Sequence, residues 1–370
     1  QRLRLHYFAT ASENLRFVYR MEVGDLTWGQ PGAVGKGVGG ARGADGVNVE
    51  TKNAFVQFTL PDTPLRTTLG IQGMALHKGW WLDDDFAAAR FDMDFDPLSV
   101  LLYYAQHTNS DSTSTQDDIW NTAVSVGYTA ENWNARASLG WQRGQTTGQV
   151  NQDDLYILMA DFGYKWDWIS FFALGGMNFG KIEYESGGPE NQDYKGWLVD
   201  GGVDFMFDPF TVGVEAFYVS GDDDPGEGDR DNFTYFSGRS HYWAEILGLG
   251  SLDRDGSTVG DDGPGADAYD SGLFAVKLGG TWKALENTKL TLNGWFVQLA
   301  EDRPDDLAKK PDSKDDAIGT EVDFYLDQKI MDNLTFQFIG AYLFADSAFG
   351  TASDADDDAY EIGARVQMTW

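Results

Sequence analysis

The C-terminal segment of this chain alternates strictly between apolar and polar residues. From Tyr360 to Trp370 every even position is apolar, whereas the odd positions include Glu361, Arg365 and Gln367. Side chains that alternate in this way along a β-strand lie on opposite faces of the sheet. One face of this strand therefore suits an apolar environment and the other suits water. This is the pattern of a strand in a membrane-spanning barrel, and also of a strand at the surface of a soluble sandwich.

The same period-two pattern recurs along the whole chain and predicts seventeen strands. They are expected near residues 2–9, 14–25, 49–60, 65–76, 86–96, 98–108, 118–129, 133–143, 154–166, 168–183, 192–206, 209–219, 272–284, 288–300, 317–329, 332–345 and 358–370. The connections alternate between short turns, such as residues 61–64, and longer loops rich in Gly, Asp and Ser. Short turns at one rim and long loops at the other are typical of bacterial outer-membrane barrels.

We therefore predict an all-β fold, a transmembrane antiparallel β-barrel in which residues 1–370 form a single domain. Single-chain bacterial barrels have an even number of strands, so a count of seventeen leaves two alternatives. In the first, which we prefer, a further strand precedes residue 1 and the intact barrel has 18 strands. In the second, residues 1–9 form a partial strand that closes against residues 358–370, and the barrel has 16 strands.

The composition supports a membrane barrel over a soluble protein. The chain has 370 residues with 44 Gly, no Cys, 14% aromatic residues and a formal charge of −32. No stretch approaches the roughly 18 consecutive apolar residues of a membrane helix, whereas a strand crosses with about 9 to 11 residues, half of which are polar. Aromatic residues gather beside the short turns, as in the interfacial girdle of a barrel. They are Tyr128, Trp133, Trp166, Trp168, Phe210, Trp282 and Trp370.

Together, the terminal aromatic residue, the alternation, the short turns and the long acidic loops resemble the bacterial outer-membrane porins. The segment from Arg2 to Gly29 is similar to the early hairpin of porins related to the alginate-export group, which are large barrels with an arginine-rich lumen. The resemblance implies a location in the outer membrane of a Gram-negative bacterium and a homotrimer. It also implies that the C-terminal strand carries the assembly signal. Its residues here are Tyr360, Ile362, Val366, Met368 and Trp370.

If the apolar residues of each strand face lipid, their polar neighbours face the lumen. The first strands and the last one then form a basic wall of Arg2, Arg4, Arg16, Arg20, Arg66, Arg90, Arg136 and Arg365. The middle and later strands form an acidic wall of Asp161, Asp200, Asp204, Glu215, Glu321 and Asp323. Opposed walls of this kind set an electric field across the pore. Alternatively, the arginines pair with neighbouring carboxylates and fill the interior of the barrel.

The longest predicted loop, residues 220–271, has acidic ends and an apolar middle over residues 232–249. Such a middle is too apolar to remain in solvent, so it folds into the barrel mouth or packs on a neighbouring subunit. Inward folding makes Arg239 and His241 candidate constriction residues. The Gly-rich loop 29–48 is a second candidate for narrowing the pore.

Runs of Asp in the loops are candidate Ca²⁺ ligands, because hard cations take clustered oxygen ligands; solvated surface is the alternative. The candidates are Asp222, Asp223, Asp224, Asp253, Asp255, Asp356 and Asp357. Divalent ions bound there would bridge the acidic loops to lipopolysaccharide. We expect no required cofactor and no nucleic-acid partner.

Signals for an enzyme fail on inspection. Residues 35–40 match GxGxxG without a surrounding βαβ unit, the four histidines do not make a zinc site, and no complete Ser/His/Asp grouping is evident. The sequence instead favours an outer-membrane porin for passive diffusion of small hydrophilic solutes and ions, with a preference for small anions. Two alternatives stay open. One is a substrate-specific channel for an acidic saccharide or organic acid, and the other is a structural or adhesive barrel plugged by its own loops.

Overall fold

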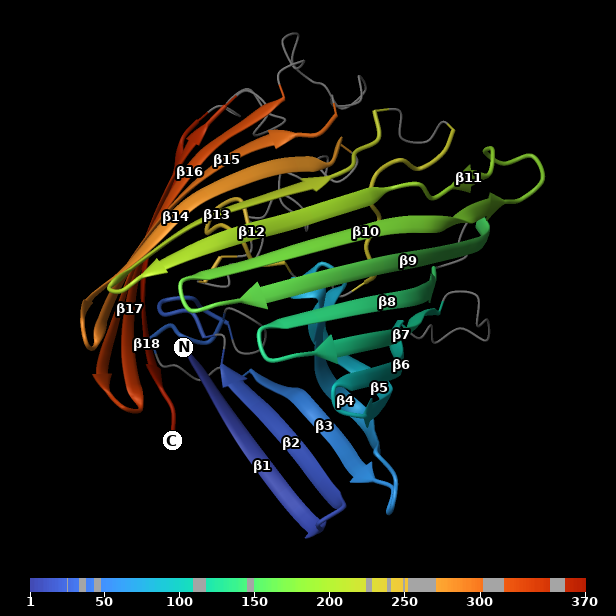
Figure 1. Ribbon diagram of the computed structural model, residues 1–370, viewed down its shortest axis with the longest axis horizontal. Helices are drawn as coiled ribbons and strands as arrows, with labels where there is room; N and C mark the ends of the chain where they lie inside the picture. Colours follow the sequence, from blue (N-terminus) through green and yellow to red (C-terminus); the bar gives the residue numbers. More distant parts are fainter. Residues whose placement is uncertain are drawn as a thin grey trace.

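A computed structural model describes the chain apart from residues 25, 33–37, 43–47, 109–117, 145–149, 224–227, 238–240, 249, 252–270, 302–315 and 347–356. In this described part, eighteen strands form one antiparallel sheet that curls into a barrel (Figure 1). Each strand pairs with the next strand in the chain, except that β10 pairs with both β11 and β12. No helix among these residues is long and apolar enough to cross a membrane.

The strands have ten to sixteen residues each, except for β11, which has two. They are β1 (Arg2–Ser12), β2 (Leu15–Gly24), β3 (Val49–Thr59), β4 (Leu65–Leu76), β5 (Leu82–Asp94), β6 (Leu98–Thr108), β7 (Ile119–Thr129), β8 (Trp133–Arg143), β9 (Val150–Lys165), β10 (Ile169–Tyr184), β11 (Gln192–Asp193), β12 (Trp197–Phe207), β13 (Phe210–Val219), β14 (Leu273–Leu285), β15 (Thr288–Leu299), β16 (Ala317–Met331), β17 (Leu334–Ala345) and β18 (Ala359–Met368). A 3₁₀ turn, η1 (His77–Gly79), lies between β4 and β5.

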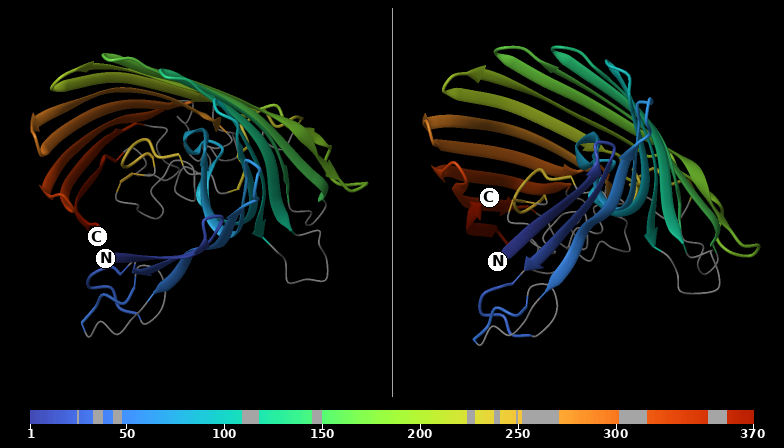
Figure 2. Two further views of the ribbon diagram at one scale, coloured as in Figure 1. Left: turned by 60° about the horizontal axis from the view of Figure 1, so that its bottom comes forward. Right: turned by 90° about the horizontal axis from the view of Figure 1, so that it is seen from below.

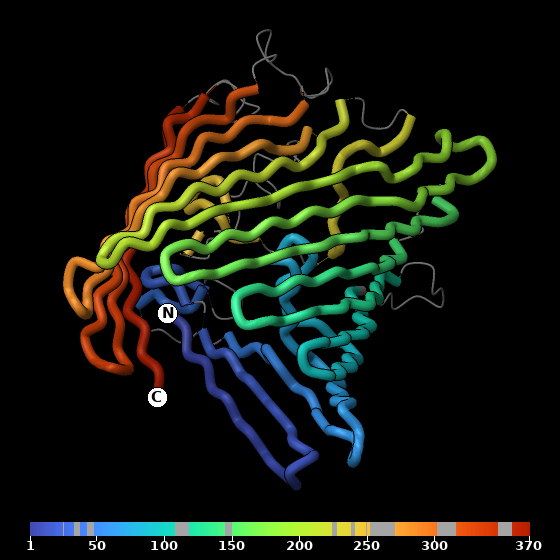
Figure 3. The backbone as a smooth tube through the Cα atoms, in the orientation of Figure 1, coloured from blue at the N-terminus to red at the C-terminus, as the bar shows by residue number. Residues whose placement is uncertain are grey.

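The short connections lie along one rim of the barrel and the longer ones along the opposite rim (Figure 3). The two termini lie close together (Figure 2). β1 is a full strand that pairs with β2 along its length, from Arg2 to Ser12, so residues 1–9 are not the partial strand of the sixteen-stranded alternative. A strand preceding residue 1 stays a prediction.

Alternation along the strands produces an apolar outer face and a mixed inner face. In β18, the side chains of Tyr360 and Ile362 are 72% and 69% exposed, whereas Glu361 between them is 7% exposed. The expected aromatic girdle is also present beside the short turns. There the rings of Tyr128 and Trp133 stack with centroids 4.7 Å apart. Exposed apolar side chains all around such a sheet suit a lipid environment.

The predicted strands match the observed ones to within a few residues, with three larger differences. β9 begins at Val150 instead of residue 154. β5 begins at Leu82 instead of residue 86, so the Asp run at 83–85 lies in a strand. The predicted strand 192–206 is broken between β11 and β12, where Tyr194 forms an isolated bridge with Arg230. At this break Gly196 lies directly against the long loop, because a Cβ atom there would be 2.3 Å from the carbonyl oxygen of Asn232.

Two segments fold into the barrel interior, as Figure 2 shows. One is the β4–β5 connection, residues 77–81, which we call the inward corner. The other is the described part of residues 229–251, which we call the inner loop. Buried aromatic side chains from both segments pack against the inner face of the strands and form a core with them. These side chains are Trp80, Trp81, Phe233 and Phe236, which meet Phe217 and Trp295 on the wall.

Candidate functional site

The inward corner has an unusual backbone that turns it toward the barrel axis. Three consecutive residues, His77, Lys78 and Gly79, have positive φ angles of 52°, 57° and 84°. This region costs a non-glycine residue about 1 kcal/mol or more, so it persists only where surrounding contacts hold it. The corner has such contacts on several strands. They fix the direction in which each of its side chains points.

His77 is held by a chain of polar contacts that reaches three strands of the wall. Its Nδ1 atom lies 2.5 Å from Oδ2 of Asp161 on β9, and its Nε2 atom lies 2.7 Å from Oγ of Ser138 on β8. Ser138 Oγ is in turn 2.8 Å from Oγ of Ser125 on β7. The order Asp, His, Ser is that of a hydrolase triad. However, Ser138 is 2% exposed and its Oγ atom is engaged by Ser125, so the chain fixes the corner and presents no accessible nucleophile.

The side chain of Lys78 extends from the corner to β12 and β13. Its Nζ atom is 3.1 Å from Oδ2 of Asp200 on β12 and 2.9 Å from Oε1 of Glu215 on β13. It also lies 3.3 Å from the ring centroid of Phe172. The other oxygen of Glu215 contacts Lys277 Nζ on β14 at 2.5 Å. We call Lys78, Asp200, Glu215 and Lys277 the charge bridge.

Both tryptophans of the corner donate hydrogen bonds to residues of the wall. Trp80 Nε1 donates to Oδ2 of Asp200 at 3.0 Å, and Trp81 Nε1 donates to the hydroxyl of Tyr103 on β6 at 2.8 Å. Buried indole N–H groups normally require such acceptors. The corner is therefore attached to both sides of the barrel.

The inner loop packs directly on the corner. The ring of His241 stacks on that of Trp80 with centroids 3.9 Å apart, and its Nδ1 atom is 2.9 Å from the carbonyl oxygen of Lys78. The ring of Phe236 meets Trp81 edge-on at 5.1 Å. Of the two predicted constriction candidates, His241 thus lies inside the barrel, whereas Arg239 lies outside the described residues.

Hydrogen bonds tie the inner loop to distant strands. Backbone N–H groups of Ile246 and Leu247 donate to the two carboxylate oxygens of Glu321 on β16, at 2.7 and 2.9 Å. Asn178 on β10 bonds both backbone groups of Thr234, at 3.0 and 2.6 Å. These contacts bury the apolar middle of the loop within the chain's own barrel. Packing of the long loop on a neighbouring subunit stays a prediction.

At the start of the inner loop, an exposed ion pair joins it to the break between β11 and β12. The ammonium of Lys195 donates to the carboxylate of Asp229, and this hydrogen bond lowers the pKa of that carboxyl. The backbone is paired at the same place, where Lys195 N–H bonds Arg230 O at 2.9 Å and Arg230 N–H bonds Asp193 O at 2.8 Å. The loop therefore enters the barrel from a fixed position.

Comparison with known proteins identifies the architecture. No family model matches the chain, and no curated protein matches it either. Solved structures do match over its whole length. OpdK of Pseudomonas aeruginosa aligns with a TM-score of 0.57 and 10% identity, over 100% of this chain and 92% of that one. OpdQ of the same organism gives 0.57 and 10% over 100% and 90%, and OprD gives 0.55 and 9% over 99% and 91%.

The chain has the fold of a bacterial outer-membrane porin. Identities of 9 to 10% establish this fold and nothing finer. They confirm the resemblance to the porin fold and the predicted all-β barrel.

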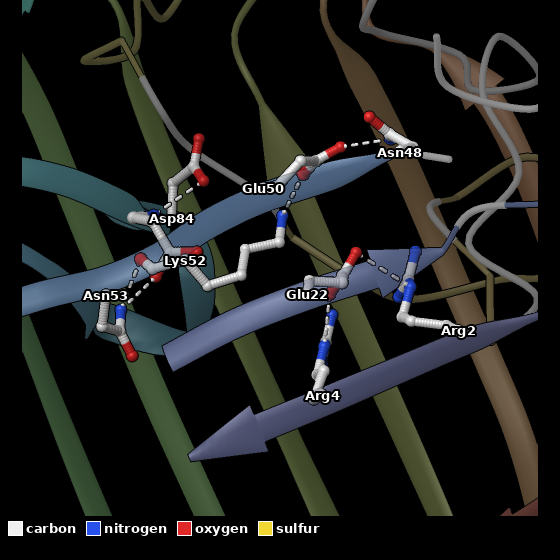
Figure 4. A network of polar contacts seen from close by, with 9 residues as sticks. Arg2, Arg4, Glu22, Asn48, Glu50, Lys52, Asn53 and Asp84 are labelled. Atoms are coloured by element: carbon white, nitrogen blue, oxygen red, sulfur yellow. Dashed lines mark hydrogen bonds and ion pairs between the residues drawn. The ribbon is translucent and has the colours of Figure 1, made fainter. Parts of the chain in front are cut away.

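Within this fold, four of the eight arginines of the predicted basic wall form ion pairs with carboxylates. Arg2 and Arg4 share the buried carboxylate of Glu22, at 3.2 and 2.5 Å, and a second group on β3 joins Glu50 with Lys52 (Figure 4). Similar pairing occurs on β4 and β5, where Asp92 contacts Arg66 at 3.7 Å and Arg90 at 2.8 Å. These four arginines therefore pair with neighbouring carboxylates, as in the alternative to an open basic wall.

Four arginines of the predicted wall lie outside these pairs. In the described residues, Arg16, Arg20 and Arg136 make no ion pair, and Arg20 has a buried Nε atom without a hydrogen-bond partner. Arg365 bonds the carbonyl oxygen of Ser251 at 3.0 Å and the side chain of Gln337 at 2.7 Å, so it also contacts the end of the inner loop. These four residues add positive charge that no ion pair within the described residues neutralises.

Residues of the predicted acidic wall take three different roles. Asp161, Asp200 and Glu215 hold the inward corner, as described above. Glu321 and Asp323 are 0% exposed, because the inner loop covers them. Asp204 is exposed on β12. The inward corner and the inner loop therefore contact most residues of the predicted acidic wall.

The calcium prediction is not tested by this structure. Asp222 is buried, while Asp223 and Asp357 are exposed. Four candidates lie outside the described residues: Asp224, Asp253, Asp255 and Asp356. Within the described ranges, no group of three or more His, Asp or Glu side chains is placed to hold a metal ion. Residues 33–37 and 43–47 of the loop 29–48 are likewise outside the description.

Sequence analysis missed the inward corner. The strand pattern predicts a loop at residues 77–85, although His77, Trp80 and Trp81 in it are apolar or aromatic. The rule that located the inner loop, namely that a strongly apolar loop leaves solvent, also applies to this segment. Applied there, it would have located Lys78 inside the barrel as well.

Proposed function

We propose that this chain forms a water-filled channel in the outer membrane, through which small hydrophilic solutes and ions diffuse passively, with a preference for small anions. The observation that carries the proposal is a barrel with an apolar outer face whose inner face keeps arginines without carboxylate partners. Arg16 and Arg20 lie on the same face of β2 as buried Val18, and Phe17 on the opposite face is exposed. Guanidinium groups remain charged at every physiological pH, so they attract anions into the lumen.

In this proposal, selection is by size and by charge. A barrel of 16 to 18 strands leaves an aqueous channel unless its interior is filled. Here the inward corner and the inner loop reduce the cross-section, which excludes large solutes. The arginines and the charge bridge then act on ions that pass beside these two segments.

A barrel plugged by its own segments is the second candidate, and one observation favours it. The rings of Trp80, Phe217, Trp243 and Trp295 pack against one another inside the barrel, with centroids about 5 Å apart in successive contacts: 5.2 Å, 5.2 Å and 5.1 Å. Such a core leaves less room for water on that side. A plugged barrel would serve a structural or adhesive role and would pass no solute.

Swelling of proteoliposomes separates these candidates. The folded protein is reconstituted and diluted into isosmotic solutions of uncharged sugars of increasing size, and then of small organic anions or organic cations of matched size. The proposal predicts rapid swelling with the smallest sugars, a sharp size limit, and faster entry of anions than of cations. Arg136→Gln should reduce the anion advantage, whereas Lys283→Gln, at an exposed position beside a short turn, should not. Folded protein that produces no swelling would establish the plugged barrel, and saturable entry of one organic acid would indicate a substrate-specific channel.

We propose no catalytic role for the Asp161, His77 and Ser138 chain. The support is the burial of Ser138, whose hydroxyl contacts Ser125 in place of a solute. A fluorophosphonate probe should therefore leave the folded protein unlabelled. Labelling that is lost in Ser138→Ala would reverse this assignment.

The assembly and its partners are further proposals. A homotrimer, contact with lipopolysaccharide and Ca²⁺ binding by the acidic loops follow from the resemblance to porins and from the sequence. Chemical cross-linking in mild detergent tests the trimer. Calorimetric titration with CaCl₂ tests the metal, with EGTA-treated protein as the starting material.

A further inference from the structure

We infer that Lys78, in addition to the arginines, sets the charge selectivity of this channel where the inward corner meets the wall, an inference that rests on the proposed function. The charge bridge carries it. This cluster lies where the inward corner meets the opposite strands, and its four members alternate in sign in the order Asp200, Lys78, Glu215, Lys277.

The four side chains differ in their access to water. The side chain of Lys78 is 38% exposed, whereas those of Lys277, Glu215 and Asp200 are 24%, 14% and 0% exposed. The carboxylates therefore lie behind the ammonium groups. An ion that passes the inward corner meets a positive charge first, although the cluster as a whole is neutral.

The position of Lys78 is fixed from both sides. On the backbone side, its carbonyl oxygen is 2.9 Å from His241 of the inner loop, and the preceding residue, His77, is held by Asp161 and Ser138. On the side-chain side, its Nζ atom lies between two carboxylates and over the ring of Phe172. A charge held in this way keeps its place as ions pass, which a lysine on a free loop would not do.

The net charge of the cluster predicts whether each substitution favours anions or cations. Removing the charge of Lys78 leaves two carboxylates against one lysine, so the cluster becomes negative. Neutralising Asp200 leaves two lysines against one carboxylate, so the cluster becomes positive. One uncompensated charge at ~6 Å, in an aqueous medium of dielectric constant ~80, changes the entry of anions by about threefold and that of cations by about threefold in the opposite direction, so their ratio changes by about tenfold.

The test is the reversal potential of single channels in a planar bilayer under a KCl gradient. Lys78→Gln should lower the chloride-to-potassium permeability ratio by about threefold to tenfold. Lys329→Gln is the matched control, because it removes the same charge from an exposed lysine beside the short β16–β17 turn, and it should change the ratio by less than about 1.5-fold. Asp200→Asn should shift the ratio in the opposite direction from Lys78→Gln.

Chemical modification makes the test independent of folding differences between variants. The chain has no cysteine, so Lys78→Cys introduces a single thiol. Modification of an open channel with 2-aminoethyl methanethiosulfonate, which adds a positive charge, should restore the anion permeability within one recording. Modification with 2-sulfonatoethyl methanethiosulfonate, which adds a negative charge, should lower it further.

The outcomes separate this inference from the proposed function. If the wild-type protein conducts but Lys78→Gln and both modified forms keep its permeability ratio, Lys78 does not set selectivity and the channel assignment stands. If the folded wild-type protein gives no steps at all, both the channel and the role of Lys78 are overturned.

Discussion

The backbone N–H of Ile246 in the inner loop lies 2.7 Å from Oε1 of Glu321 on β16, and the next N–H, that of Leu247, lies 2.9 Å from the other oxygen of the same carboxylate. Hydrogen bonds to a charged acceptor are worth about 1.5 to 3 kcal/mol each. Since the two groups are 75 and 74 positions apart in sequence, this carboxylate determines where a distant loop lies inside the barrel.

Glu321→Ala should release the inner loop from β16. Both N–H groups then lose their acceptor, so we expect a larger and noisier single-channel conductance and faster protease cleavage between residues 232 and 251. Glu286→Ala removes an exposed carboxylate at the β14–β15 turn and serves as the control. Unchanged conductance and protease resistance in Glu321→Ala would show that other contacts suffice to hold the loop.

Replacement of His77 should weaken the whole inward corner. His77→Ala removes the contacts to Asp161 and Ser138 and leaves a cavity beside the buried Ser138, which lowers the free energy of unfolding by about 2 to 4 kcal/mol. Unfolding in guanidinium, followed by tryptophan fluorescence in detergent, measures the change. His6→Ala, at an exposed position on β1, should cost less than about 0.5 kcal/mol. Equal effects of the two substitutions would contradict the assigned role of His77.

Gly140 on β8 allows both inward segments to approach the wall. A Cβ atom at this position would lie 2.5 Å from Cζ2 of Trp81 and 2.8 Å from Cε2 of Phe236. Gly140→Ala should therefore displace both rings, destabilise the protein by about 1 to 3 kcal/mol and alter the conductance. Gly175→Ala on β10 is the control, because the nearest atom to its added Cβ is 3.8 Å away. A neutral Gly140→Ala would mean that the rings do not pack against β8.

The ion pair at the start of the inner loop predicts a dependence on pH. Lys195 lowers the pKa of Asp229 in the folded state, so this contact stabilises the loop entry above the unfolded carboxyl pKa of about 3.9. That stabilisation is lost as pH falls through the folded value. Hydrogen exchange of the Lys195 and Arg230 amides, corrected for intrinsic rates, should show less protection at pH 3 than at pH 6.

A charge-removing substitution isolates this contribution. Lys195→Gln should lower the protection of the same amides at pH 6 and abolish the difference between the two pH values. Lys181→Gln, which removes an exposed pair with Glu183 on β10, should leave both unchanged. The account of the loop entry fails if Lys195→Gln retains the full pH difference.

Local patterns in the sequence were sufficient to predict the strands but not the interior. The alternation from Tyr360 to Trp370 identifies the lipid face of β18, because side-chain direction in a strand depends only on parity. The apolar middle of residues 232–249 similarly predicts that the long loop is buried. In contrast, the contact between Lys78 and Asp200 joins residues 122 positions apart. It depends on three positive φ angles in a row, of which only that of Gly79 has a sequence signal.

The sequence also does not predict which of the arginines form ion pairs with carboxylates. Arg16 and Arg4 look equivalent by parity, yet Arg4 meets Glu22 across the β1–β2 pair and Arg16 meets no carboxylate in the described residues. Register between strands decides this difference, and register follows from turns and bulges that alternation alone does not locate.

The central claim is that the barrel contains a water-filled path beside its inward corner and inner loop. The most direct measurement is the current through the purified, folded wild-type protein in a planar bilayer. Our account predicts discrete, stable steps and, under a KCl gradient, a reversal potential of the sign that favours chloride. Cation preference would contradict the role of the arginines and of Lys78, and a complete absence of steps would contradict the channel itself.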